Sequence, residues 1–255
     1  MKYGEFIRKT AMGLALPLLI ILAWFHASPG SSLVSSPGEV YDTIVESLQN
    51  GFLLENLLVS FSRVMQGFLY GSLAGLFLGT LTGVSARADR IISPFFHAVR
   101  NVPIVGWIPL FIIWFGFGDL SEIMLIAVGA FFPAVLNTYQ GIHSAGRNYV
   151  EVGRIFNLKD SQIFRRIVLP SALPSIVTGI RISLSNSWMF VVVAEIFGVT
   201  SGGIGNMMND AREAFRMNIV IMGIIAIGIV GLLLNQVLSL LERRLLVWRL
   251  AERKP

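Results

Sequence analysis

Residues that could carry enzymatic chemistry are scarce in this sequence of 255 residues. Cysteine is absent, so the chain has no thiol nucleophile, disulfide or cysteine-based metal site. The three histidines, His26, His97 and His143, are far apart in the sequence, and none lies near a cluster of carboxylates. Zinc sites and nucleophile–base pairs need such groups together. We therefore expect no catalytic residue and no metal ligand.

Two charged residues stand out because they lie within apolar runs. Arg63 and Glu195 would be costly in hydrocarbon, so both are candidates for a substrate path or gate. Each lies toward the outer end of its run, and we expect the two side chains to come within ion-pair distance in at least one state. The alternative is that Arg63 extends outward to the lipid headgroups while Glu195 is protonated or bonds to backbone. Trp188 is a third candidate for the path, although packing is the more common role of a tryptophan there.

The composition indicates that these residues belong to an all-α membrane protein. Hydrophobic residues make up 54% of the chain and charged residues 14%, against roughly a quarter charged in soluble domains. Six apolar segments approach the ~20 residues that span a bilayer. They are 10–27, 60–84, 100–118, 121–141, 173–199 and 217–241. We see no linker, and expect one domain over 1–255.

Basic residues predict the orientation of these six spans. Most of the 20 lysines and arginines fall in segments that share a side with the N-terminus, Arg100 among them. Cytoplasmic loops are rich in such residues, so both termini are predicted to be cytoplasmic. The net charge of +5 therefore reflects membrane topology and does not indicate binding to nucleic acid.

A regular row of glycines runs along the second predicted span. Its members recur every four residues and fall on one helix face: Gly67, Gly71, Gly75, Gly79 and Gly83. Small residues at this spacing let two membrane helices approach closely. We expect this face to pack against a neighbouring helix.

The inner segment 142–172 is long, basic and amphipathic. Its apolar positions follow a helical period, with Tyr149, Val152 and Phe156 in the first half. A simple connection between two spans needs only a few residues. From the pattern alone, the segment could lie in the lipid headgroups or dock a partner protein.

The order of residues in this segment resembles a known motif. Glu151 to Asn157, nine further residues and then Ile167-Val-Leu-Pro170 are similar to the cytoplasmic signature of ABC importer permeases. The resemblance implies that 147–170 forms a helix–turn–helix that docks into an ATP-binding subunit. The implied coupling residues are Tyr149, Glu151, Val152, Gly153, Phe156, Asn157, Leu158 and Lys159. Asn157 replaces the usual glycine, and asparagine is the next most tolerant residue in a left-handed turn.

Other motifs resemble the sulfonate, taurine and nitrate branch of these permeases. Arg100-Asn-Val-Pro103, Asn209-Asp-Ala-Arg-Glu213 and Leu241-Glu-Arg-Arg-Leu245 look most like aliphatic sulfonate permeases. The resemblance implies a type I ABC importer transmembrane domain in the bacterial inner membrane. It implies a second permease copy (a homodimer), two ATP-binding subunits and an external substrate-binding protein. The cargo would be an aliphatic sulfonate or taurine, with nitrate or bicarbonate as the alternative.

No phosphate-binding loop of the Gly-x4-Gly-Lys-Ser/Thr type is present, so ATP and magnesium are expected on the partner subunit and no cofactor on this chain. A secondary transporter is the main rival, but it usually shows inverted repeats and buried coupling carboxylates. A channel would show a filter sequence, and an intramembrane enzyme would show paired catalytic groups. Co-purification with a separate ATPase would distinguish the permease from all three.

Overall fold

The computed structural model describes residues 19, 22–26, 35–145, 147–198 and 200–245, and this part of the chain is helical with no β-strand. Its elements are α2 (Pro37–Gln49), α3 (Phe52–Val84), α4 (Ala86–Arg100), η1 (Ile104–Trp107), α5 (Ile108–Phe115), α6 (Asp119–His143), α7 (Arg147–Ile155), α8 (Asp160–Ile163), η2 (Phe164–Val168), α9 (Leu169–Phe197), α10 (Ile204–Glu213) and α11 (Met217–Leu245).

In the described part of the chain, four helical segments are long and apolar enough to cross a membrane. They are α3, α6, the continuous segment Asp160–Phe197 that contains α9, and the stretch Met217–Leu240 of α11. Four predicted segments coincide with them, although α3 begins at Phe52, eight residues before its predicted start. The predicted span 10–27 falls mostly outside the described residues, as do both termini.

The fifth segment differs from the prediction of one span over 100–118. Here α4 and the η1–α5 segment form a pair bent by 97°. The bend lies at Asn101–Pro103, because proline has no N–H to continue a helix and disfavours helical backbone in the residue before it. Arg100 is therefore the last residue of α4 and lies at the bend, and it does not begin a straight span.

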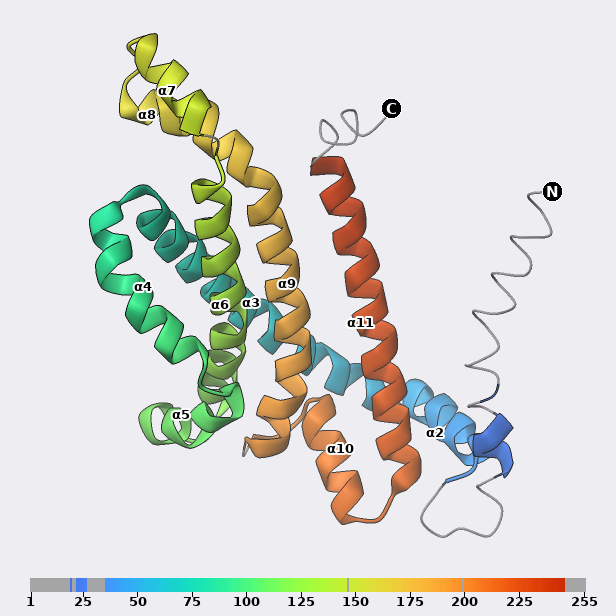
Figure 1. Ribbon diagram of the computed structural model, residues 1–255. Helices are drawn as coiled ribbons and strands as arrows, with labels where there is room; N and C mark the ends of the chain where they lie inside the picture. Colours follow the sequence, from blue (N-terminus) through green and yellow to red (C-terminus); the bar gives the residue numbers. More distant parts are fainter. Residues whose placement is uncertain (1–18, 20–21, 27–34, 146, 199, 246–255) are drawn as a thin grey trace, which may run out of the picture.

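Three helices form the centre of the molecule, with α3 and α9 both packed against α6 (Figure 1). The bent α4–α5 pair lies on one side and α11 on the other. The connection α7–α8 extends from one end of this bundle, whereas α10 and α5 lie at the opposite end. The two ends of the bundle therefore carry different structures.

The predicted glycine row in α3 is the contact with α6. A Cβ atom added at Gly71 would lie 2.1 Å from the carbonyl oxygen of Ala127, and one at Gly75 would lie 2.6 Å from the Cβ of Ala134. Neither distance can be accommodated without moving a backbone. The packing role predicted for the row is confirmed, and it holds α3 and α6 at backbone contact.

Candidate functional site

The first candidate site surrounds Arg63, which is buried near the start of α3. Its guanidinium donates to Oδ1 of Asp119 from Nε at 2.9 Å and from Nη2 at 2.6 Å. Nη1 donates to Oε1 of Glu195 at 2.9 Å and lies 3.1 Å from Oε2 of Glu122. The predicted contact of Arg63 with Glu195 is confirmed. The alternative, an arginine extended to the headgroups, is wrong, because the side chain is 4% exposed.

Glu195 is completely buried near the end of α9, and both of its carboxylate oxygens accept hydrogen bonds. Ser60 donates its hydroxyl to Oε1 at 2.7 Å, and the backbone N–H of Gly205 donates to Oε2 at 2.7 Å. The Ser60 oxygen in turn accepts from the N–H of Ile204 at 2.8 Å. Side chains of α3 and α9 thus satisfy the free backbone N–H groups at the start of α10.

Glu122 and Asp119 supply the other two carboxylates of the site. Glu122 is 2% exposed and accepts a hydrogen bond from the Thr200 hydroxyl, whereas the Asp119 side chain is 66% exposed. We call Ser60, Arg63, Asp119, Glu122 and Glu195 the Arg63 cluster. Three carboxylates facing one guanidinium would repel an anion. The geometry therefore favours a structural role for Arg63, in which it links neighbouring helices, over direct binding of an anionic substrate.

Glycines let the segment after α9 approach this cluster. A Cβ atom at Gly203 would lie 2.3 Å from Oε1 of Glu195, and one at Gly198 would lie 2.1 Å from Oε1 of Glu122. Gly203 also has φ +104, which other residues rarely adopt. The carbonyl of Gly202 accepts from Arg63 Nη1 at 2.9 Å. Arg63 therefore joins α3, α6, α9 and the loop that leads into α10.

Sequence reasoning missed Asp119, Glu122 and Ser60. The two acids lie at the boundary between two predicted spans, where acidic residues commonly begin a helix. Their spacing of three residues placed them on one helix face, and that signal could have marked them as partners for a buried arginine. Ser60 gave no comparable signal, because a serine is inexpensive in a membrane helix.

Trp188 lies in the packed core and not in the Arg63 cluster. It is 6% exposed, and its indole N–H donates to the carbonyl of Ile227 in α11 at 3.1 Å. Nearer the other end of the same helix pair, Arg181 donates to Glu242 at 2.8 Å and to Asn235 at 2.7 Å. These contacts support a packing role for Trp188 between α9 and α11; its role in a substrate path stays a prediction.

The second candidate site is the α7–α8 connection, 147–163, which we call the hairpin. Two short helices meet at Asn157, as predicted, and Asn157 has φ +55. The N–H of Asn157 donates to the carbonyl of Arg154 at 2.9 Å, and the N–H of Leu158 donates to the carbonyl of Gly153 at 3.1 Å. This pair of bonds is the Schellman motif, which ends a helix with one left-handed residue.

The two faces of the hairpin differ sharply. Gly153 is buried, and a Cβ atom there would lie 3.0 Å from Ile167 and 3.3 Å from Ile163, so a small residue allows α7 to pack on the following segment. On the other face, Val152, Ile155 and Phe156 are 47%, 76% and 75% exposed. Such an apolar patch on the end of a protein is typical of a protein interface.

Polar residues surround this patch. Glu151, Asn157 and Lys159 are exposed and Leu158 is half-buried, whereas Tyr149 is described by its place in α7 alone. The side-chain oxygen of Gln162 accepts a hydrogen bond from the backbone N–H of Lys159 at 2.9 Å, and this bond caps the start of α8. The structure thus gathers the predicted coupling residues in α7 and in the turn between α7 and α8, at the end of the molecule opposite α10 (Figure 1).

A π-helical turn, η2, connects the hairpin to α9. The N–H of Leu169 donates to the carbonyl of Phe164 five residues earlier. Pro170 explains the widening, because it has no N–H for the carbonyl of Arg166 and its ring would clash with that carbonyl in an α-helix. Pro170, the proline of the permease-like motif, therefore determines the helical geometry of the connection between the hairpin and the membrane span α9.

Comparison with known proteins places most of the chain in one family. Residues 71–247 match the family model described as "Binding-protein-dependent transport system inner membrane component". A protein of Bacillus subtilis strain 168 named as an aliphatic sulfonates transport permease, SsuC, is 41% identical, over 93% of this chain and 87% of its own. The protein of the same name in Escherichia coli K12 is 35% identical, over 91% of this chain and 90% of its own.

A relative with another named cargo is the nitrate import permease NrtB of Leptolyngbya laminosa. It is 31% identical, over 94% of this chain and 89% of its own. Among solved structures, a chain of a methionine ABC transporter in inward-facing conformations superposes with a TM-score of 0.66. That match is 20% identical and covers 75% of this chain and 95% of the other, so it shows a shared fold.

Proposed function

This chain belongs to the family of binding-protein-dependent transport system inner membrane components and is a multi-pass ABC importer permease, and we propose that its cargo is an aliphatic sulfonate or taurine. The observation that carries this cargo is the 41% identity, over nearly the whole chain, to a permease named for aliphatic sulfonates. Nitrate and bicarbonate are the second candidates, because permeases named for these anions are 31% and 30% identical over 94% of the chain.

The hairpin is the part of this chain that we assign to coupling. Its exposed residues Val152, Ile155 and Phe156 form an apolar patch on a rigid support, held by the Schellman motif and by the contact of Gly153 with Ile167. A cleft in the ATP-binding subunit would bury this patch, and the polar residues Glu151 and Lys159 would lie at its rim. ATP and magnesium bind to that subunit, and this chain contributes no cofactor.

The transporter that we propose contains several subunits. Two copies of this chain, a homodimer, enclose the path, two ATP-binding subunits dock on the hairpins, and an external binding protein delivers the substrate. Each copy is one domain with six membrane spans. It lies in the inner membrane of a bacterium, with both termini in the cytoplasm. The position of the hairpin and α10 at opposite ends of the bundle supports this orientation (Figure 1).

Transport in proteoliposomes tests the proposal. The permease would be reconstituted with its ATP-binding subunit and binding protein, and uptake of radiolabelled taurine and ethanesulfonate would be compared with uptake of nitrate and bicarbonate. ATP-dependent uptake of a sulfonate is the expected result. Uptake of nitrate or bicarbonate alone would assign the second cargo, and uptake without the ATP-binding subunit would contradict the coupling assignment.

Phe156→Ser tests the hairpin separately from the cargo. Removing the aromatic ring of the patch is expected to reduce ATP-dependent uptake at least tenfold and to weaken co-purification of the ATPase. Tyr41→Ser is the matched control, because Tyr41 is 66% exposed on α2, away from the hairpin. Equal effects of the two substitutions would contradict the assignment of the hairpin as the docking site for the ATP-binding subunit.

A further inference from the structure

A cavity of about 260 Å³ lies between α3, the α4–α5 pair and α6. Every residue that lines it is aliphatic or aromatic, and Phe96, Trp107, Phe111 and Phe132 are among its ring-bearing walls. An engineered apolar cavity of roughly 150 Å³ stays free of water and binds benzene. This cavity is therefore large enough for an organic group bigger than benzene, and its walls offer that group only dispersion contacts and exclusion of water.

The rim of the cavity has a different character. The helix break at Asn101–Pro103 leaves irregular, exposed backbone beside the cavity residues Val99 and Trp107. Irregular backbone at membrane depth is tolerated where it is covered by protein or faces a polar path, because hydrocarbon offers no hydrogen bonds. The break beside the cavity therefore suits a polar group.

Arg100 gives this rim a positive charge. It is the last residue of α4 and lies one helical turn after Phe96, so the two share a helix face. In the described part of the chain it forms no ion pair, unlike Arg63 and Arg181. An exposed guanidinium without a carboxylate partner can bind an anionic head group.

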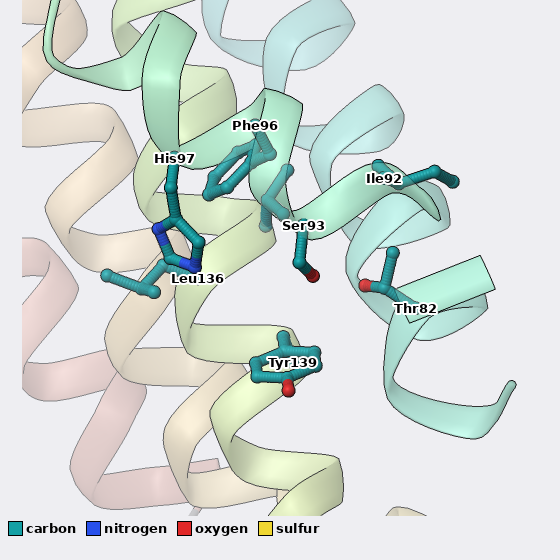
Figure 2. Close-up of a pocket in the computed structure, with 8 residues that line it drawn as sticks. Thr82, Ile92, Ser93, Phe96, His97, Leu136 and Tyr139 are labelled. Atoms are coloured by element: carbon teal, nitrogen blue, oxygen red, sulfur yellow. The ribbon is translucent and has the colours of Figure 1, made fainter. Parts of the chain in front are cut away.

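Polar groups also adjoin the end of the cavity nearer the hairpin. Figure 2 shows a smaller pocket in which the side chains of Ser93, His97 and Tyr139 lie close together. It shares Ile92 and Phe96 with the apolar cavity. The apolar cavity is thus flanked by polar side chains on the side nearer the hairpin.

We propose that this cavity holds the hydrocarbon chain of an organosulfonate in transit, with the sulfonate group at Arg100. The proposal rests on the sulfonate cargo assigned above and adds to it a subsite in the permease that favours longer chains. A lipid acyl chain is the other source of hydrocarbon, and the experiment separates the two.

The test is the dependence of uptake on chain length in the complete transporter. Val128, which lines the cavity, would be changed to Phe so that the added ring fills part of the volume. Ile229→Phe on the exposed face of α11 adds a ring of the same kind away from the cavity and is the control. The same binding protein is used throughout, so each ratio of variant to unmodified rates reports on the permease.

Uptake of hexanesulfonate by Val128→Phe is expected to fall at least tenfold relative to uptake of methanesulfonate, because each methylene kept from an apolar site costs about fourfold in affinity. Ile229→Phe should leave this ratio unchanged. Arg100→Gln should reduce uptake of both sulfonates by a similar factor, since both carry the same head group.

Loss of a co-purified phospholipid from Val128→Phe in native mass spectrometry, with an unchanged chain-length ratio, would show that a lipid occupies the cavity and would overturn the proposal. An equal effect of Val128→Phe on both sulfonates would also overturn it. Absence of any sulfonate uptake by the unmodified transporter would instead refute the cargo assignment on which the subsite rests.

Discussion

Nη1 of Arg63 lies 2.9 Å from Oε1 of Glu195, a residue 132 positions later in the chain. Both side chains are buried, so each charge relies on the other and on the surrounding hydrogen bonds. The contact joins the beginning of α3 to the end of α9 and places the start of α10 against both. It therefore holds α3, α9 and α10 together at one end of the molecule.

Removal of the guanidinium should destabilise the folded chain strongly. Arg63→Met leaves Glu122 and Glu195 buried without a cation, and breaking a buried ion pair costs about 3–5 kcal/mol. We expect a lower melting temperature and yield in detergent, whereas Arg216→Met, at an exposed arginine, should have little effect. The double variant Arg63→Met with Glu195→Gln should be no less stable than Arg63→Met alone. Strictly additive losses would show that the two residues act independently.

Asn157 should distinguish backbone strain from loss of a side chain. Valine at φ +55 is strained by about 1–3 kcal/mol, whereas glycine is not. Asn157→Val should thus reduce coupled transport several-fold at normal expression, and Asn157→Gly should transport like the unmodified protein. If both variants fail equally, the amide group itself is required and the conformational explanation is wrong.

The glycine contact between α3 and α6 predicts a sharp contrast between two identical substitutions. Gly71→Ala places a methyl group 2.1 Å from a carbonyl oxygen, so the helices must separate and folded protein should be nearly lost. Gly228→Ala in α11 meets nothing within 4 Å and should be neutral or stabilising by up to about 1 kcal/mol, since alanine favours a helix. Thermal stability in detergent measures both. Similar behaviour of the two variants would contradict the close packing.

The absence of cysteine allows a direct test of orientation. Ser161→Cys on the hairpin and Glu213→Cys on α10 are exposed positions at opposite ends of the bundle. In intact spheroplasts, a membrane-impermeant maleimide should label Glu213→Cys and should label Ser161→Cys only after lysis. The reverse pattern would invert the proposed topology.

Patterns of hydrophobicity and glycine spacing predicted much of this fold. Long apolar runs predicted α3, α6, α9 and α11, because a span is marked by its length alone. The bent α4–α5 pair was not predicted, because α4 carries Arg87, Asp89 and Arg90 and does not read as apolar. Pro103 was the available sign that the run beginning at residue 100 starts at a break.

The candidate sites were predictable to different degrees. The hairpin depends on local order along the chain, so its motif and its left-handed residue could be recognised directly. The Arg63 cluster depends on contacts between residues 56 to 135 positions apart, and only the cost of burying Arg63 and Glu195 pointed to it. The positions of Asp119 and Glu122 follow from the register of α3 against α6, which the glycine row permits but does not specify.

The Arg63 cluster also has a consequence for biogenesis. Asp119, Glu122 and Glu195 all follow Arg63 in the sequence, so α3 is synthesised before any of its carboxylate partners. At about 5–20 residues per second, the ribosome needs about 3–11 s to reach Asp119 and longer to reach Glu195. During that interval an unpaired arginine in a membrane helix costs at most about 2.5–3.5 kcal/mol, the value for the helix centre, and less toward the end of the helix. The contacts of Arg63 are thus completed late, and a chain that stops before α9 has Asp119 and Glu122 but lacks Glu195.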